Sequence, residues 1–139
     1  MRPFYQLFDH TSDLGVQVKA EDLKSLFKNA ALTLTDLMTD IKTVRNQSDR
    51  IIEVQSENIE LLLREWLSEL LFVFHTSGFL VSEVDVLDMS DKRFKARIFG
   101  EKYHKKCHVL QREIKSVTYH QLKVIVEEHE ATAQFILDI

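Results

Sequence analysis

The sequence predicts an α+β fold, a largely antiparallel sheet packed with two amphipathic helices. Two long segments carry apolar residues at helical spacing, whereas most of the remaining chain alternates between apolar and polar residues, as half-buried strands do. Successive connections after Gly78 are of hairpin length, which favours antiparallel pairing. The 139 residues suit one compact domain, and no repeat or low-complexity segment divides them, so we expect a single domain over residues 1–139.

The first helix is expected over residues 23–38, where apolar residues recur every three or four positions and form one continuous face. Asp22 precedes it as the expected N-cap. The second helix is expected over residues 59–74, with Asn58 as its N-cap and Gly78 as its stop. This second helix is apolar over most of its circumference, which is typical of a helix buried between layers.

The strands are predicted from alternation and from short apolar runs. The expected strand segments are residues 14–20, 50–54, 79–86, 94–99, 114–126 and 131–138. In the last of them, one face carries the apolar side chains of Ala131, Ala133, Phe135 and Leu137. Counted from the start of the chain, the order is strands, helix, strand, helix and then a run of strands.

Composition excludes several classes of protein. The formal net charge is −4 and the pI is near 5.8, whereas a protein that binds nucleic acid with its whole surface is usually basic. The stretch KYHKKCH from Lys102 is a local basic exception. No apolar run approaches the ~18 residues of a membrane span, and the N-terminus lacks the apolar region of a secretory signal. With Cys107 as the single cysteine, we expect no internal disulfide, and a cytoplasmic protein.

The common nucleotide and hydrolase motifs are absent. The sequence has no Walker A segment, no G-x-G-x-x-G, no G-x-S-x-G, no H-E-x-x-H and no C-x-x-C. With only three glycines, the chain has few residues for a phosphate-binding loop. We therefore do not expect it to bind a nucleotide in a phosphate loop of its own.

The stretch DHTSDLG at residues 9–15 concentrates polar chemistry in one short loop between strands. One interpretation is a turn whose Asp and Ser side chains accept hydrogen bonds from loop amides, and the residue types alone favour it. The other is a site for a hard cation such as Ca²⁺ or Mg²⁺, which prefers oxygen ligands. Asp9 and Asp13 could supply such oxygens, although one loop rarely completes a coordination shell.

The end of the sequence offers further oxygen ligands. Asp138 brings a side-chain carboxylate, and Ile139 brings the main-chain carboxylate. If the last strand lies beside the DHTSD loop, two or three carboxylates converge, and their repulsion favours a bound cation. The alternative is a frayed and solvated terminus, against which the apolar character of ATAQFILDI argues.

Two later segments also carry polar chemistry. HKKCH at residues 104–108 offers His104, Cys107 and His108, but a zinc site needs a fourth ligand and different spacing, so an exposed loop is the favoured interpretation. EIKSVTYHQLKV, from Glu113, is expected to form a strand or a hairpin. The side chains of Lys115, Thr118, Tyr119 and His120 could line a cleft there, although an alternating strand with a half-buried Tyr119 is favoured. His75 suits the end of a helix, where the helix dipole favours a cation.

Taken in order, these segments resemble the archease family. DHTSDLGVQV resembles the family's opening DHTAD-G motif, and LFKNAALTLTDLM and EWLSELLFVFHTSGFL resemble its first and second helices. GEKYHKKCHVLQREIKSVTYHQLKV and the final FILDI resemble its C-terminal motifs. The matches keep their order and cover essentially the whole chain.

The resemblance implies an accessory protein with no complete active site of its own. Archease-like proteins activate the GTP-dependent RNA ligase of tRNA splicing and RNA repair, promoting its guanylylation and multiple turnover. The resemblance also implies a divalent cation, Ca²⁺ or Mg²⁺ with Mn²⁺ as a further candidate, held by Asp13, Asp138 and Ile139. Lys115 matches a family lysine implicated in activation. The ligase is then the expected partner, RNA is contacted indirectly if at all, and no membrane contact is expected.

The chain departs from the family pattern at several positions. Ser12 and Ser116 stand where alanine is usual. HKKCH replaces the usual Y-D-x-x-R-H, which leaves the role of this loop open, and EEHEATAQ replaces the G-W that precedes the last strand. Two other functions share the same residues: a stand-alone metal-dependent phosphoester hydrolase with His10 or His120 as its base, and a chaperone-like interaction module whose metal is structural.

Overall fold

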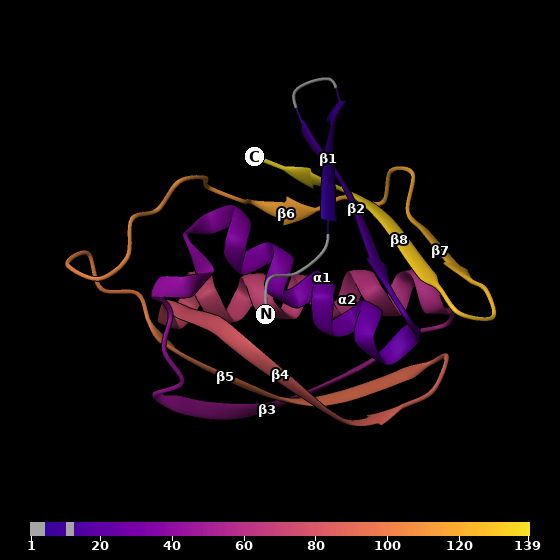
Figure 1. The fold of residues 1–139 in the computed structure, drawn as a ribbon, viewed down its shortest axis with the longest axis horizontal. Helices are drawn as coiled ribbons and strands as arrows, with labels where there is room; N and C mark the ends of the chain where they lie inside the picture. The colour runs from indigo at the N-terminus through magenta and orange to yellow at the C-terminus, as the bar shows by residue number, and fades with distance from the viewer. Residues whose placement is uncertain (1–4, 11–12) are drawn as a thin grey trace.

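The computed structural model describes residues 5–10 and 13–139. Its two helices form a middle layer between two antiparallel sheets (Figure 1). The elements along the chain are β1 (Tyr5–His10), β2 (Asp13–Ala20), α1 (Leu23–Met38), the 3-10 turn η1 (Ile41–Thr43), β3 (Ser48–Gln55), α2 (Ile59–Ser77), β4 (Phe79–Met89), β5 (Arg93–Lys102), β6 (Ser116–Val117), β7 (Lys123–Val126) and β8 (Ala131–Asp138). The predicted α+β class is confirmed, and the structure divides the expected strands between two sheets.

The larger sheet is built around the C-terminal strand. Its order is β1-β2-β8-β6, and β7 pairs with the same edge of β8 as β6 does. The smaller sheet has the order β3-β5-β4. All of these pairings are antiparallel, so the first hairpin and the end of the chain become neighbours in one sheet.

The helices begin and end where the sequence indicates. Asp22 accepts a hydrogen bond of 2.8 Å from the Ser25 N–H at the start of α1, and Asn58 caps α2 in the same manner at Leu61. α2 runs three residues beyond the expected range, to Ser77, and stops at Gly78. Gly78 has a φ of 72°, a left-handed conformation that glycine adopts at little cost.

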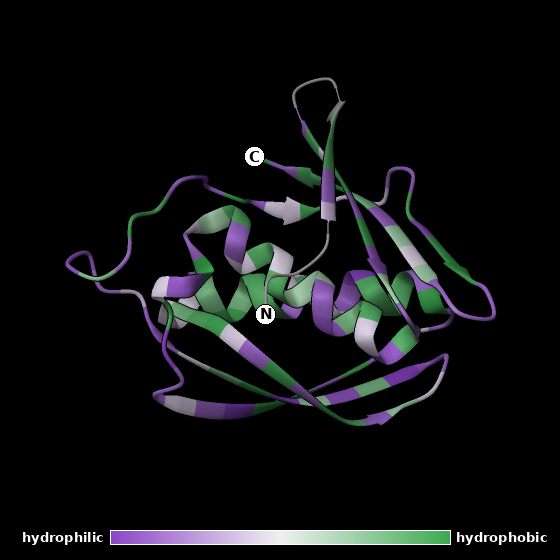
Figure 2. Ribbon diagram, viewed as in Figure 1, coloured by the Kyte–Doolittle hydropathy of each residue, from purple (hydrophilic) through white to green (hydrophobic). Residues whose placement is uncertain are grey.

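The core lies between the layers and includes buried apolar residues of both helices and of strands in both sheets. Figure 2 shows apolar residues along both helices. Trp66 of α2 is fully buried and its indole N–H donates to the Phe27 carbonyl of α1 at 2.9 Å. Its ring also lies edge-on to Phe94 of β5, with ring centroids 4.6 Å apart. A single side chain thus joins both helices to the smaller sheet, as expected for a helix that is apolar over most of its surface.

The alternating strand expected over residues 114–126 is formed only in part, and the hairpin considered as its alternative is not formed, because β6 and β7 each pair with β8 and not with each other. Only β6 and β7 are strands there, and the chain turns between them. Both short strands pair with β8, at Ser116 to Val117 and Lys123 to Val126, so the chain has to leave the edge and return to it. Gln121 has a φ of 50° in this turn, and its carbonyl accepts a hydrogen bond from the Gln134 side chain.

Within residues 5–10 and 13–139, no helix has both the length and the apolar content to span a membrane.

Candidate functional site

The DHTSD loop and the C-terminal strand meet at one end of the larger sheet. β2 and β8 run antiparallel over eight residue pairs, and the terminal pair is Asp13 opposite Asp138. Figure 1 shows the first hairpin and the C-terminus side by side at this end. β8 is paired on both edges, so the alternative of a frayed terminus was wrong. The two halves of the expected site are therefore strand neighbours.

The register also places both carboxylates on one face of the sheet. Residues directly opposite each other on antiparallel strands project to the same side, with Cβ atoms ~4.5–5.5 Å apart. Val16 and Leu137, whose positions face the helices, are fully buried, so the alternate positions Asp13 and Asp138 face outward. Both residues are partly exposed. Two carboxylates at this spacing repel each other unless a cation or a proton lies between them.

A third strand completes the row of polar residues. Ser116 of β6 lies opposite Asp138, on the side away from Asp13. The Lys115 N–H donates to the Asp138 carbonyl at 2.7 Å, and the Lys115 side chain is exposed. The structure thus brings Lys115, the lysine singled out in the sequence, beside the last residues of the chain. The sequence did not predict that Ser116 lies beside Asp138.

Gly15 explains why the motif contains a glycine. A Cβ at this position would lie 2.3 Å from the ring of Phe8, which sits opposite Gly15 on β1. Ile136, opposite Gly15 on β8, is fully buried although it lies on the outward face. The Phe8 ring therefore lies close against β2 one row from the Asp13 pair. A glycine inside an alternating strand is the pattern that indicates such close approach.

The donor set suits a hard cation. No group of three or more His, Cys, Asp or Glu side chains in the described part of the chain is arranged to hold a metal ion. Among the side chains that the structure describes, the donors at this edge are the two carboxylates of Asp13 and Asp138, and Ile139 adds main-chain oxygens. Ca²⁺ and Mg²⁺ accept such oxygen ligands and complete their shells with water. The residues present thus fit a cation with open coordination positions.

Some of the predicted loop residues cannot be placed. Thr11 and Ser12 lie outside the described residues. Asp9 and His10 belong to the backbone of β1, where they are paired with Leu14 and Asp13, but their side chains lie outside what the structure describes. The proposed roles of Asp9 as a ligand and His10 as a base therefore stay predictions.

Tyr119 lies in the turn after β6 and is 65% exposed. The Arg64 guanidinium of α2 lies 3.8 Å from the centre of its ring, and Arg64 also donates to the Val117 carbonyl at 3.0 Å. His120 is exposed in the same turn, where its backbone N–H donates to the Thr118 hydroxyl. Tyr119 is therefore not half-buried as expected, because the chain turns here and leaves its ring open to solvent. The sequence had not linked Arg64 to it.

His108 is a structural residue. It is buried, its Nδ1 accepts a hydrogen bond from the His104 N–H, and its Nε2 therefore carries the proton that is donated to Glu101 at 2.9 Å. Both ring nitrogens are thereby used, and Cys107 is exposed. Zinc binding by HKKCH, which the spacing already disfavoured, has no support in this geometry.

Glu101 is held as a carboxylate by its surroundings. Burial by itself would raise the pKa of Glu101, but the hydrogen bonds from the Arg45 backbone N–H and from His108, with the charge of Arg45, keep the pKa below its ordinary value of 4.5. The Arg45 N–H lies 2.9 Å from one carboxylate oxygen. Glu101 thus joins β5, the segment before β3 and the HKKCH loop.

This arrangement predicts a loss of stability in acid. A carboxylate whose folded pKa is lowered stabilises the fold above its unfolded value and loses that contribution as the pH falls through the folded pKa. The free energy of unfolding, measured with urea at pH values from 6 downward, should therefore fall more steeply below pH 4.5 in the native protein than in Glu101→Gln. Glu57→Gln, at an exposed position, is the control and should keep the native slope.

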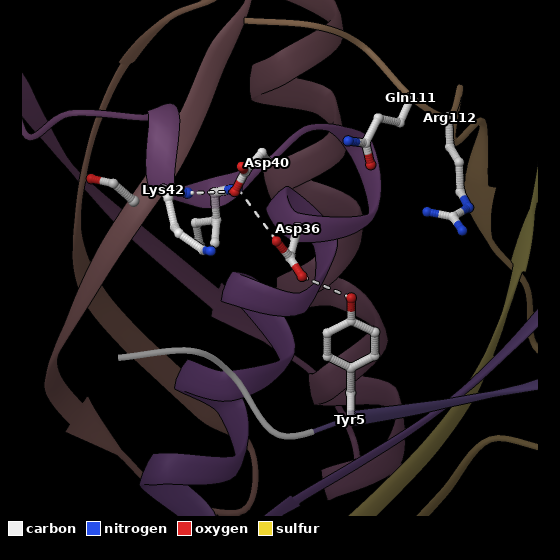
Figure 3. Close-up of a pocket in the computed structure, with 8 residues that line it drawn as sticks. Tyr5, Asp36, Asp40, Lys42, Gln111 and Arg112 are labelled. Carbon is white, nitrogen blue, oxygen red and sulfur yellow. Dashed lines mark hydrogen bonds between the residues drawn. The ribbon is translucent and has the colours of Figure 1, made fainter.

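A separate cavity of about 500 Å³ opens at the C-terminal end of α1 (Figure 3). Asp36 points into it and is held from two sides, by the Tyr5 hydroxyl at 2.8 Å and the Ile41 N–H at 3.3 Å. Gln111 and Arg112 reach it from the other side. The hydrogen bonds of Asp36 tie β1 and η1 to α1, which gives this carboxylate a structural role.

Fold and site together define a class: small α+β proteins with two antiparallel sheets around a helix pair and a carboxylate pair where the first hairpin meets the last strand. The sequence model of the Archease protein family (MTH1598/TM1083) matches residues 5–139. The chain belongs to the archease family. It is 35% identical over 138 residues to protein archease of Methanothermobacter thermautotrophicus, covering 97% of this chain and 98% of that protein. It is 33% identical over 139 residues to protein archease of Methanosarcina barkeri, covering 97% and 95%.

Solved structures agree with the fold. The solution structure of Methanobacterium thermoautotrophicum protein 1598 matches with a TM-score of 0.80 and 31% identity, covering all of both chains. The crystal structure of an archease, described as a possible chaperone, from Thermotoga maritima matches with a TM-score of 0.63. Its identity of 15%, over 95% of this chain and 94% of that one, makes it a likeness of fold alone.

Proposed function

We propose that this protein activates a GTP-dependent RNA ligase by presenting a carboxylate-bound divalent cation to the guanylylation site. The observation that carries the proposal is the pairing of Asp13 with Asp138 at the terminus of β8. Family membership supports it, since the expected cation ligands of an archease are Asp13, Asp138 and Ile139. The absence of a phosphate loop in the sequence favours an accessory protein over a nucleotide-processing enzyme.

The chain's own residues would hold and position the cation. Asp13 and Asp138 supply side-chain carboxylates from adjacent strands, and Ile139 supplies its main-chain carboxylate. When bound, Ca²⁺, Mg²⁺ or Mn²⁺ would stabilise the negative charge that develops on the nucleotide phosphates. Lys115 adds a mobile point charge from a backbone that is bonded to Asp138. Outside the basic segment at residues 102–115, the acidic balance of the chain, with a net charge of −4, suits the basic regions of an RNA-binding partner.

The proposal is tested in the ligase reaction itself. Guanylylation and multiple-turnover ligation are measured for the purified ligase alone, with the native protein, and with Asp13→Ala. We expect the native protein to raise turnover by at least about tenfold and Asp13→Ala to lose most of that gain, because a charge stabilisation of 1.4 kcal/mol already corresponds to tenfold. Equal turnover in all three reactions would show that the proposal is wrong.

The second candidate function is a chaperone-like interaction module, and possible chaperone is the description that the Thermotoga maritima structure carries for its own protein. In that case the cation at Asp13 would be structural. Asp13→Ala would then lower thermal stability and metal affinity together, and it would reduce ligase activation only in proportion to the fraction of folded protein.

A further inference from the structure

The segment between β5 and β6, residues 103–115, is a basic surface on an acidic protein. It holds four of the chain's 18 Lys and Arg residues and one of its 22 Asp and Glu residues. The four cations, Lys105, Lys106, Arg112 and Lys115, are all exposed. None of them is in an ion pair with a residue in ranges 5–10 and 13–139. Their charges are therefore available to a partner, with Arg112 also donating to the Leu37 carbonyl at 3.3 Å.

This segment, called the β5–β6 loop below, is fastened to the body at several points. His108 is buried against Glu101. The Thr39 hydroxyl donates to the Val109 carbonyl at 2.9 Å, and the Gln111 N–H donates to the Met38 carbonyl at 2.7 Å. A loop without regular structure would otherwise lose considerable entropy on binding. Because this loop is already ordered, it is prepared for docking.

The fastened backbone turns two aliphatic side chains outward. Val109 is 75% exposed and Leu110 is 45% exposed. Both are exposed even though the hydrogen bonds of the main chain at residues 109 and 111 hold this stretch against the end of α1. In Figure 1 the loop passes along the outside of the helix layer, away from the first hairpin, before it returns to β6. Val109 and Leu110 are adjacent, so together they form a small exposed apolar patch on an ordered backbone, within a segment that carries four exposed cations.

We infer that the β5–β6 loop is a docking surface for a protein partner, with Val109 and Leu110 entering an apolar depression and acidic side chains of the partner around it. Apolar residues at the centre with charges at the rim are the arrangement of protein interfaces. A nucleic acid would use the cations but would gain little from aliphatic side chains, since phosphates dominate its binding. The inference rests on the proposed function, in which the partner is the GTP-dependent RNA ligase.

The loop and the carboxylate site then have separable roles. The loop sets how tightly the partner is held, and Asp13 with Asp138 sets what happens once it is bound. Lys115 connects the loop to the carboxylate site, since it is the last residue of the loop and its backbone N–H donates a hydrogen bond to the Asp138 carbonyl. A change in the loop should therefore alter the concentration needed for half-maximal activation, and a change at Asp13 should alter the maximum.

The experiment measures binding of the protein to the purified ligase and ligase turnover as a function of protein concentration. Val109→Asp is expected to weaken binding at least about tenfold and to raise the half-maximal concentration by the same factor, with an unchanged maximum. Ile51→Asp is the control, because Ile51 is likewise an exposed β-branched residue, 50% exposed, and lies on β3 away from the loop. The double variant Lys105→Glu with Lys106→Glu should weaken binding most at low salt, and Lys92→Glu is its exposed control.

Three results would overturn the inference while the proposed function survives. Val109→Asp could bind and activate as the native protein does. It could keep its affinity for the ligase and lose affinity for a labelled single-stranded RNA, which would make the loop an RNA contact. The native protein could self-associate in sedimentation experiments, and Val109→Asp could lose that self-association while it binds the ligase as the native protein does. If the native protein neither binds nor activates the ligase, the proposed function fails first and this inference fails with it.

Discussion

Asp13→Asn is expected to weaken divalent-cation binding at least tenfold, because it removes one of two facing carboxylates while keeping the size of the side chain. Cation affinity at such sites depends on the number of charged oxygen ligands. The pairing of Asp13 with Asp138 across β2 and β8 also brings two carboxylates close together, and the variant carries one negative charge fewer at this pair.

Loss of the cation and loss of one negative charge change the stability of the variant in opposite directions, so the experiment can separate them. In a chelator, Asp13→Asn should be at least as stable to heat as the native protein. In excess Ca²⁺ or Mg²⁺, the native protein should gain stability as RT ln(1 + [L]/Kd), and the variant should gain little. Asp85→Asn, an exposed carboxylate on β4, should respond to cations as the native protein does. A native melting temperature that no divalent cation changes would contradict the predicted site.

The contribution of Ile139 is separated from that of Asp13 by extending the chain. One added glycine converts the main-chain carboxylate of Ile139 into a peptide group and moves the new carboxylate away. If Ile139 is a ligand, cation affinity should fall by a factor comparable to that of Asp13→Asn. An extended protein that binds the cation with native affinity would remove Ile139 from the ligand set and leave Asp13 and Asp138 in it.

Gly100→Ala is expected to have the largest effect on stability of any single methyl addition in the smaller sheet. A Cβ at Gly100 of β5 would lie 1.8 Å from the Leu80 carbonyl oxygen and 2.9 Å from the Leu80 carbonyl carbon. These are backbone atoms of the paired strand β4, where the register shifts just beyond Val81. Relief requires the strands to separate, so we expect the free energy of unfolding to fall by about 3 kcal/mol, at the upper end of overpacking costs.

Gly15→Ala is the control, because it adds the same methyl group against a side chain. The nearest atoms there belong to the ring of Phe8, which can rotate or shift. Urea unfolding of both variants should therefore show a clearly smaller loss for Gly15→Ala. Equal losses, or a negligible loss at Gly100, would mean that β4 and β5 are not held as closely as the structure has them.

The helices of this protein were predictable from the sequence, because their determinants are local. The spacing of apolar residues, the N-caps Asp22 and Asn58 and the stop at Gly78 predicted α1 at its observed bounds and α2 to within three residues at its end. Each of these features acts within one or two turns of the residue concerned. The apolar character of the second helix similarly indicated a position between layers.

The strands were predictable only in part. Alternation indicates which side chains share a face of the sheet, but it does not indicate which strands pair. Residues 114–126 alternate, yet only β6 and β7 pair, since the chain has to leave the edge of β8 and return to it. The division of the strands into two sheets and the burial of His108 against Glu101 likewise depend on distant segments. No periodicity contains that information.

The carboxylate site shows the same division. The sequence by itself determined the chemistry, with oxygen ligands in DHTSD and at Asp138 and Ile139, and the family resemblance selected Asp13 among them. Only the tertiary structure decided that Asp13 faces Asp138 across one strand pair, with Lys115 and Ser116 on the other side. The physical reason is that strand register is fixed by burial of alternate apolar residues along the whole of β2 and β8. A shift of β8 by one residue would have placed Asp138 on the opposite face of the sheet from Asp13.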